Sequence, residues 1–461
     1  MREKGRLTSA RAVALTALYR VDHEGAYVNL VLGELLDQAE LPARDRAFAT
    51  ELAYGTLRWR GRIDWVLSHF VRRSLASQHP YVRNILRLGA YQLLFLPNVP
   101  AAAAVNESVR LAKGHKAARH AAPFVNAVLR KVAREGIGLA PPSVADDEAA
   151  ALSVETSHPE WMVRRWLGQY GPDVVRPLLL ANNEPAPLSV RVNTLRASVE
   201  TLLARLDREG VQAQPSPVLP GSVRLEGAPG LASIASFRDG WFTAQDEGSQ
   251  VVAYAVDPRP GETVWDMCSA PGTKTTHMAE LMGDEGRIVA VDIHAERLRL
   301  VDEGCKRLGL GSVRTVQGDA REPVGPPGSA DKVLVDAPCS GTGVLRRRPD
   351  LRWHRRESDF DELIQLQRSI LLGSSALVKS SGGVLVYSTC SVDMEENLGN
   401  VRWFLRECPD FRLDSLESVL PASLLATFTP ERMETVRAGY VQLWPHLDGT
   451  DGFFIARLIR R

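Results

Sequence analysis

Short apolar runs that alternate with helical stretches constrain the C-terminal half of this chain more than any other feature. Between residues 241 and 461 these runs read TVWDM, RIVAVD, VRTVQGD, KVLVDAP, GVLVYSTC and FFIARL. Strands separated by helices are typical of a parallel sheet with helices on both faces. We therefore predict a doubly wound, Rossmann-like α/β domain over residues 241–461.

The N-terminal third of the chain has a different period. Apolar residues recur three or four positions apart through residues 10–21, 48–70 and 82–96, as in amphipathic helices. We predict an all-α bundle over residues 1–140, followed by a linker in the Gly- and Pro-rich stretch GIGLAPPSVADD. Residues 150–240 mix strand-like runs such as LSVRVNTL with the helical run SVETLLARLDREG, and they predict a small α+β subdomain.

Composition limits the classes of protein that fit. A chain of 461 residues exceeds what one hydrophobic core usually organises, which agrees with several domains. Lys and Arg number 56 against 55 Asp and Glu, so net charge by itself does not indicate a nucleic-acid partner. The five cysteines contain no CxxC pair, which argues against a disulfide framework and a structural metal site. Neither a long apolar run nor a signal-type N-terminus is present, so we expect a cytoplasmic protein without a membrane partner.

Polar residues follow the apolar runs, where an open α/β sheet binds its ligands. The first loop, DMCSAPGTKTTHMAE, lacks both GxxxxGK[ST] and GxGxxG, so a triphosphate or pyrophosphate is disfavoured. Asp292 can accept hydrogen bonds from two ribose hydroxyls, and Asp319 can accept one from adenine N6. Any one of these residues could equally be a helix cap or a turn residue. Together they predict an adenosine cofactor without a pyrophosphate.

Two cysteines follow neighbouring apolar runs, Cys339 in DAPCSGTG and Cys390 in YSTCS. A buried structural cysteine is the usual alternative, but both residues come after the runs instead of within them. Addition of a thiolate at carbon 6 of a pyrimidine makes carbon 5 nucleophilic enough to take a methyl group. Asp336 is placed to hydrogen-bond the ring at N3 and the exocyclic amine. The residues by themselves leave open which cysteine attacks.

The motifs DMCSAPGTK, DAPCSGTG, YSTCS and GVLRRRPDLRWHRR resemble those of the RsmB/Nop2/Sun family of RNA 5-methylcytosine methyltransferases. The likeness is strongest to its RsmB branch, also called Sun or Fmu, which modifies 16S ribosomal RNA of the small subunit. It covers nearly the whole chain, and the N-terminal region resembles NusB, an RNA-binding antitermination factor. The resemblance thus implies a NusB-like RNA-binding domain, an RNA-binding middle subdomain and a methyltransferase domain. We expect a monomer, although the sequence does not set the oligomeric state.

The resemblance also implies roles for particular residues. Cys390 would be the nucleophile, and Cys339 would assist product release. DNA cytosine methyltransferases use the cysteine of the PC motif instead, but their ENV motif is absent here. Thr273 departs from the family's APGGK loop, in which a second Gly is common, and its effect on the turn is open. The residues implied to hold S-adenosylmethionine are Cys268, Ser269, Ala270, Pro271, Gly272, Thr273, Lys274, Asp292, Asp319 and Asp336.

A basic run follows Cys339 and has Trp353 within it. A solvated helix face is the ordinary explanation of such a run. Beside a catalytic loop, it also suits a grip on phosphates and an unpaired base. We predict RNA contacts at Arg346, Arg347, Arg348 and Arg352. A second, weaker candidate in the N-terminal region comprises Lys113, His115, Lys116, Arg119, Arg130 and Lys131.

Two other functions remain open at this stage. Transfer-RNA methyltransferases share the catalytic motifs, and only the helical domain and the GVLRRRPD run favour ribosomal RNA. A non-catalytic assembly factor would also keep both folds, but such a protein should have lost part of the donor loop, Asp336 or the TC cysteine, and all are present. We therefore expect an enzyme that methylates cytosine at carbon 5.

Overall fold

The computed structural model describes residues 9–227 and 230–461, and the chain divides into two compact units. Unit 1 comprises Met1–Glu184 together with Leu345–Glu357, and unit 2 comprises Pro185–Val344 together with Ser358–Arg461. The first eight residues of the predicted helical domain, and residues 228–229 of the predicted α+β subdomain, lie outside the described residues. None of the described helices combines the length and the apolar content that crossing a membrane requires.

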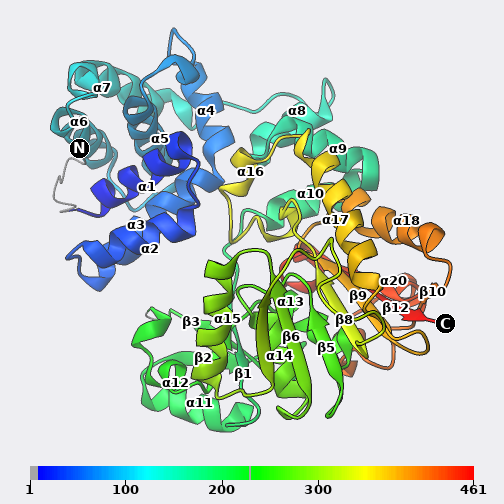
Figure 1. Ribbon diagram of the computed structural model, residues 1–461. Helices are drawn as coiled ribbons and strands as arrows, with labels where there is room; N and C mark the ends of the chain where they lie inside the picture. The colour runs from blue at the N-terminus through cyan, green and yellow to red at the C-terminus, as the bar shows by residue number, and fades with distance from the viewer. Residues whose placement is uncertain (1–8, 228–229) are drawn as a thin grey trace. The chain divides into compact units, whose positions relative to one another are not determined.

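Unit 1 is helical, as the recurrence of apolar residues every three or four positions predicts (Figure 1). Ser9 caps the first helix by accepting a hydrogen bond from the Ala12 amide, and Gly25 ends that helix at a φ of 68°. Val13, Leu18 and other residues on the same face are buried in the bundle core. The helices are α1 (Ala10–Glu24), α2 (Val28–Gln38), α3 (Ala43–Arg58), α4 (Arg60–Ser68), α5 (Pro80–Phe95), α6 (Ala101–Gly114), α7 (Ala122–Lys131), α8 (Glu148–Thr156), α9 (Glu160–Tyr170), α10 (Pro172–Ala181) and α16 (Leu351–His354).

Helices α8 to α10 pack within unit 1, although the sequence placed them at the start of the α+β region. Ser157, directly after α8, accepts a hydrogen bond from the Gly61 amide of α4 at 2.8 Å. His158 and Trp166 are also buried in this part of the unit. The recurrence of apolar residues along a helix does not reveal such long-range contacts, and this part of unit 1 extends to Glu184.

Unit 2 begins with a small antiparallel sheet in the order β2-β3-β1-β4. Its strands are β1 (Leu188–Val192), β2 (Gln212–Pro215), β3 (Ser222–Glu226) and β4 (Phe242–Ala244), with helices α11 (Val199–Arg208) and α12 (Ala235–Arg238). Ser198 and Thr201 form a capping box that starts α11. Val190, Leu202 and Phe242 are fully buried between this helix and the sheet. The predicted α+β subdomain is therefore present.

The large sheet of unit 2 has eight strands, in the order β10-β12-β9-β8-β5-β6-β7, with β11 paired to β12. All six predicted runs are strands: β5 (Thr263–Asp266), β6 (Arg287–Asp292), β7 (Val313–Gln317), β8 (Lys332–Asp336), β9 (Val384–Thr389) and β12 (Phe453–Arg460). The first five pair in parallel, as expected. In contrast, β12 pairs antiparallel with β9, β10 (Phe411–Leu413) and β11 (Tyr440–Leu443). The sheet is therefore mixed, not parallel throughout.

Alternate residues of one strand show that both faces of this sheet are covered. Leu334 of β8 packs in the cluster that contains α13 (Glu247–Val256) and α14 (Thr273–Leu281). Its neighbours Val333 and Val335 pack in the cluster that contains residues of α17 (Asp359–Ser375) and α18 (Asn400–Glu407). The further helices are α15 (Ala295–Leu308), α19 (Ala422–Leu425), α20 (Pro430–Arg437) and α21 (Pro445–Asp448). The domain is thus doubly wound, as predicted.

Candidate active site

The parallel strands lie in the order β7-β6-β5-β8-β9. From β5 the chain first adds β6 and β7 on one side of the sheet and then β8 and β9 on the other, so the switch point lies between β5 and β8. Ligands of such sheets bind at the carboxyl ends of the strands beside this switch point. Asp266 ends β5, Asp292 ends β6 and Asp336 ends β8, while Cys390 directly follows β9. The topology therefore gathers the predicted donor residues and the predicted cysteines of unit 2 along one edge of the sheet.

The two cysteines face each other, with 3.3 Å between the Sγ atoms. They meet because β8 and β9 are neighbours in parallel register, with Asp336 opposite Ser388. The hydrogen bond to Cys390 and burial raise the pKa of the Cys339 thiol well above its usual range. The negative charge of nearby Glu396 acts in the same direction. Cys339 is thus held in its protonated form.

Asp336 lies on the same edge and is oriented by two side chains. Lys274 donates to one carboxylate oxygen at 2.8 Å, and Ser388 donates to the other at 2.7 Å. Burial by itself would lower the pKa of Lys274. The negative charge and the hydrogen bond of Asp336 have the larger effect, so the pKa of Lys274 is raised. Each carboxylate oxygen keeps a further lone pair, so Asp336 can still accept a hydrogen bond from a ligand.

The loop from Cys268 to Lys274 turns sharply into α14. Gly272 caps the helix at a φ of 98°, and an added Cβ would lie 3.1 Å from the Val301 backbone, so only glycine fits there comfortably. Thr273 begins the helix in place of the family's second glycine. The Ala270 amide donates to Asp292 Oδ2 at 3.3 Å, and the His294 amide donates to Oδ1 at 2.9 Å. Asp292 therefore shapes the loop and lies at the carboxyl end of β6.

Two buried polar atoms of this loop region have no hydrogen-bond partner among the described residues, Asp266 Oδ1 and Ser269 Oγ. The other oxygen of Asp266 accepts from Thr275 at 2.7 Å. Burial raises the pKa of Asp266 to about 7, and the charge of Asp336 contributes to the rise. Unsatisfied buried acceptors are costly unless a ligand pairs with them, so the loop fits a cofactor with donor groups. Asp319 is less enclosed and pairs with Arg321 at 2.5 Å.

Glu396 is a residue of this site that our sequence analysis missed. Its buried carboxylate accepts hydrogen bonds from the Ser340 amide at 2.9 Å, Ser340 Oγ at 2.5 Å, Ser391 Oγ at 2.5 Å and Gln367 Nε2 at 2.8 Å. Ser340 directly follows Cys339, and Ser391 directly follows Cys390. One carboxylate therefore ties together the two loops that carry the cysteines. Its nearness to YSTCS was the only signal in the sequence.

The basic run after Cys339 belongs to unit 1, whereas the cysteines belong to unit 2. Arg352 is fully buried and donates to Arg58 O, Ser157 O, Asn182 O and Asn183 Oδ1 at 2.7–3.1 Å. Arg346 is buried, while Arg347 and Arg348 are partly exposed. The burial of Arg352 favours a structural role over the RNA contact expected from the sequence. The contacts predicted for Arg346, Arg347 and Arg348 stay predictions.

Family models match three successive parts of this chain. The family model described as 16S rRNA methyltransferase RsmB/F matches residues 253–459. A NusB family model matches residues 8–134, and a ferredoxin-like domain of RsmF/B-like methyltransferases matches residues 158–231. The three matched ranges lie within the three domains predicted from the sequence.

Similar proteins extend over the whole chain. A Bacillus subtilis protein named "Probable ribosomal RNA small subunit methyltransferase B" is 38% identical over 98% of this chain and 99% of its own. The Escherichia coli ribosomal RNA small subunit methyltransferase B is 36% identical, with 98% of each chain covered. The crystal structure of PH0851 has a TM-score of 0.81 at 30% identity and covers 97% of this chain and 98% of its own.

Another solved structure is similar to part of this chain. The crystal structure of NSun6 from Pyrococcus horikoshii with SFG has a TM-score of 0.57 at 26% identity, and covers 64% of this chain and 97% of its own. These matches support S-adenosylmethionine as the methyl donor. This chain belongs to the RsmB/F family of methyltransferases and is an S-adenosylmethionine-dependent RNA methyltransferase.

Proposed function

We propose that this enzyme methylates carbon 5 of a cytosine in 16S ribosomal RNA, through a covalent bond between Cys390 Sγ and carbon 6 of the base. The distance of 3.3 Å between the Cys339 and Cys390 sulfurs, at the strand edge that also carries Asp336, is the observation that supports this most. A cysteine at this edge lies where the methyl donor and the cytosine must both bind. A pyrimidine needs a nucleophile bound at carbon 6 before carbon 5 reacts.

The chain's own residues suit S-adenosylmethionine. Asp292 would accept from the ribose, Asp319 from the adenine, and the unpartnered Asp266 Oδ1 and Ser269 Oγ would pair with the cofactor's polar groups. When bound, S-adenosylmethionine supplies an electrophilic methyl group.

In the first step, the Cys390 thiolate forms a bond to carbon 6, and the displaced electron pair makes carbon 5 nucleophilic. Asp336 would hold the base by hydrogen bonds at N3 and the exocyclic amine. The hydrogen bonds that Lys274 and Ser388 donate to the Asp336 carboxylate keep that carboxylate in place. Carbon 5 then forms a bond to the methyl carbon as the bond from that carbon to the donor sulfur breaks, with S-adenosylhomocysteine as the co-product.

Product release requires that the carbon 5 proton leaves and that the bond between Cys390 Sγ and carbon 6 breaks. The electron pair of the broken C–H bond re-forms the ring double bond, and the sulfur departs as a thiolate. Cys339, whose raised pKa keeps it protonated, would give its proton to that departing thiolate and take up the carbon 5 proton in exchange. This geometry supports Cys390 as the nucleophile and Cys339 as the residue that assists release.

The small-subunit methyltransferase names of the full-length relatives support 16S ribosomal RNA as the substrate. Such a substrate would place the activity in the cytoplasm. Bisulfite sequencing of ribosomal and transfer RNA from a strain that lacks the gene should reveal a missing 5-methylcytosine in 16S RNA. Loss of the mark from transfer RNA alone would replace this substrate with the transfer-RNA alternative.

The cysteine roles are tested by trapping the covalent adduct. With RNA and S-adenosylmethionine supplied, Cys339→Ala should attack and transfer but release slowly, and so give a slow-migrating band on a denaturing gel that RNase removes. Cys390→Ala, alone or with Cys339→Ala, should give no band and no methylated product. A trapped band from Cys390→Ala only would reverse the roles, and full methylation by both single variants would refute the covalent mechanism.

A further inference from the structure

A buried arginine of the small antiparallel sheet reaches the helix that follows the donor loop, residues 268–274. Arg191 lies on β1, beside α14 in Figure 1, and its side chain is only 2% exposed. Its guanidinium pairs with the Glu280 carboxylate of α14 through two hydrogen bonds of 2.9 Å. Both residues belong to unit 2, so this ion pair joins the α+β subdomain to the methyltransferase domain.

The same guanidinium also contacts the start of α14. Nη1 of Arg191 donates to the Thr273 carbonyl at 2.8 Å and to Gln245, and Nη2 donates to Thr276 Oγ1 at 3.1 Å. Together with the two bonds to Glu280, these contacts use all five N–H groups of the arginine. Because the guanidinium is planar and rigid, the five bonds fix it in one orientation.

Thr276 connects Arg191 to the turn of the donor loop. Its hydroxyl accepts from Arg191 and donates to the Gly272 carbonyl at 2.9 Å. Gly272 is the residue at which the loop turns into α14, and Thr273 is the next residue along the chain. The carbonyls of these two consecutive residues are therefore bonded to Arg191, one directly and one through a hydroxyl.

The segment that carries Arg191 is itself anchored to α15. Asn193 is fully buried directly after β1 and donates to the Leu308 carbonyl, the last of α15, at 3.0 Å. In the opposite direction, Arg307 of α15 donates to the carbonyls of Phe237 and Phe242 in the α+β subdomain, both at 2.8 Å. The end of α15 is thus bonded to this subdomain from both sides.

Helix α15 packs against the donor loop as well. Arg297 donates to the Ala270 carbonyl at 2.6 Å, and Leu298 and Val301 share an apolar cluster with Ala270. Both helices that the subdomain contacts, α14 and α15, are therefore in contact with the loop.

Stability alone is a poor explanation for the pair of Arg191 and Glu280. A buried ion pair often stabilises a fold no more than an apolar pair of similar volume, because both charges lose their hydration. An apolar pair could not, however, supply directed hydrogen bonds to Thr273 and Thr276. The arrangement of the five bonds therefore favours a role in orienting the loop.

We propose that Arg191 is a positioning residue of the methyl-donor site, through which the α+β subdomain fixes the donor loop in the conformation that binds S-adenosylmethionine. The contacts between this loop and the donor rest on the proposed function, while the hydrogen bonds of Arg191 are independent of it. The subdomain thus serves donor binding in addition to the RNA binding expected from the sequence. Arg191 is buried and acts through Thr273 and Thr276.

The test measures the donor affinity of the full-length enzyme by calorimetric titration without RNA. Arg191→Met with Glu280→Leu replaces the ion pair by an apolar pair, which keeps the fold but removes the bonds to the loop. Affinity for S-adenosylmethionine should fall by about fivefold or more, since one hydrogen bond is worth about that factor. The KM for the donor should rise and the KM for RNA should stay. Residues 268–274 should exchange their amide hydrogens faster.

Two matched controls separate positioning from loss of stability. Leu202→Ala leaves a cavity in the core of the same subdomain, so it should lower the Tm and leave donor affinity unchanged. Thr276→Val removes the hydroxyl between Arg191 and Gly272, whereas Thr276→Ser keeps it. The valine variant should lose about twofold or more in donor affinity, and the serine variant should match the wild type.

Donor affinity of the Arg191 and Glu280 variant within about twofold of wild type would overturn the positioning role, and so would an equal loss in Leu202→Ala. A raised KM for RNA with unchanged donor affinity would assign Arg191 to RNA binding instead. Should the double variant fail to fold, equal affinities of Thr276→Val and Thr276→Ser would overturn the proposal by themselves. If donor affinity changes as expected but 16S RNA receives no 5-methylcytosine, the proposed function fails and the role of Arg191 stands.

Discussion

The hydrogen bonds of Glu396 predict that it positions the two cysteines without contacting the substrate. Glu396→Ala would remove the acceptor for four donors on Ser340, Ser391 and Gln367. Thr342, Ser340 and Ser391 lie within 3.0–3.2 Å of one another, so their hydroxyls can pair again. Gln367 Nε2 keeps its bond to Pro338 O at 3.0 Å. The Ser340 amide is thus the one donor of this set left without an alternative.

The loss of stability in Glu396→Ala can be worked out from this one unpaired amide. One buried amide left unpaired costs about 1–3 kcal/mol, and the weakened neighbours add about 1 kcal/mol, so the free energy of unfolding should fall by about 2–4 kcal/mol. The loop that carries Cys339 would also shift, and a displacement of about 1 Å at reacting groups can slow a reaction by about a hundredfold. We expect single-turnover methyl transfer to slow by about ten- to a hundredfold, with donor affinity unchanged.

The conservative variant separates positioning from simple loss of stability. Glu396→Gln keeps an oxygen for the Ser340 amide, and the serine hydroxyls can rotate to accept from the new amide. It should therefore recover most of the transfer rate. Burial raises the pKa of Glu396, so a neutral side chain should also become relatively more stable than the wild type as pH rises above the unfolded carboxyl pKa. Stopped-flow methyl transfer and urea unfolding measure the two effects. A transfer rate within about twofold of wild type in Glu396→Ala would refute the positioning role.

Three further outcomes are expected. Asp292→Ala should weaken S-adenosylmethionine binding by about ten- to a hundredfold in calorimetric titration, because it removes a buried acceptor and the Ala270 contact, and unchanged affinity would contradict its assignment. Binding of S-adenosylmethionine near pH 7 should release protons, because a cationic ligand lowers the pKa of Asp266 from about 7. Calorimetric titrations in buffers of different ionisation enthalpy should detect the released protons, and Asp266→Asn should abolish the release. Arg352→Ala should lower the free energy of unfolding by at least about 3 kcal/mol, whereas Arg44→Ala, at an exposed arginine of α3, should change it by less than about 0.5 kcal/mol. Equal effects would refute the structural role of Arg352.

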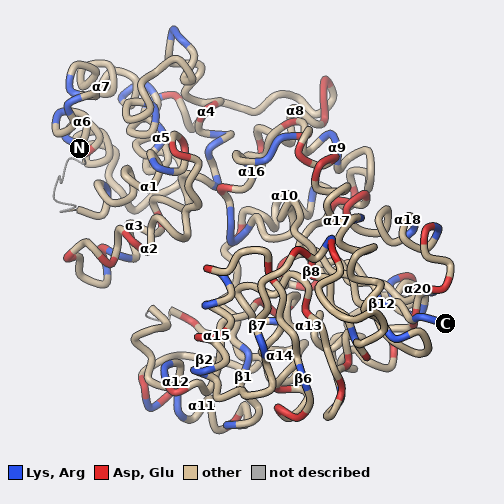
Figure 2. Tube along the Cα trace, in the orientation of Figure 1, with Lys and Arg blue, Asp and Glu red and all other residues tan. Residues whose placement is uncertain are grey.

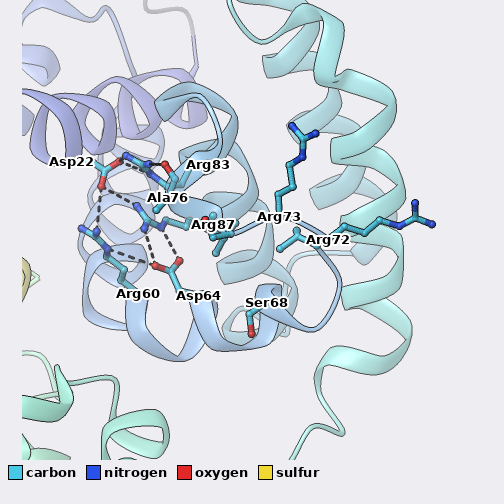
Figure 3. A pocket seen from close by; sticks show the side chains of 12 residues that line it. Asp22, Arg60, Asp64, Ser68, Arg72, Arg73, Ala76, Arg83 and Arg87 are labelled. Carbon is cyan, nitrogen blue, oxygen red and sulfur yellow. Dashed lines mark hydrogen bonds and ion pairs between the residues drawn. The ribbon is translucent and has the colours of Figure 1, made fainter.

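Charge along the sequence does not show where charged side chains lie in the fold. Figure 2 shows Lys and Arg interspersed with Asp and Glu along both units. The arginines that line a cavity of unit 1 beside Asp22 (Figure 3) come from three segments that only the folded bundle brings together. The basic run at residues 346–352 is the stronger signal of RNA binding in the sequence, yet Arg352 is fully buried.

The sequence by itself determined the features that depend on local pattern. Hydrophobic period separated the helical region from the α/β region, and all six predicted runs became strands. The position of a reactive residue directly after a strand is also local. Because parallel strands end at one edge, Asp292, Asp336, Cys339 and Cys390 could be assigned to one side of the sheet before the structure was known.

Only the tertiary structure decided the features that depend on contacts between distant segments. Residues 345–357 return to the helical unit because Arg352 finds its acceptors on Arg58, Ser157, Asn182 and Asn183. The antiparallel β10, β11 and β12 extend the sheet because their edges pair with one another and with β9. Glu396 joins the two cysteine loops because residues 340 and 391 meet across neighbouring strands. None of these pairings has a repeating signature along the chain, because hydrogen bonds between distant residues depend on three-dimensional geometry and not on the spacing of residues in sequence.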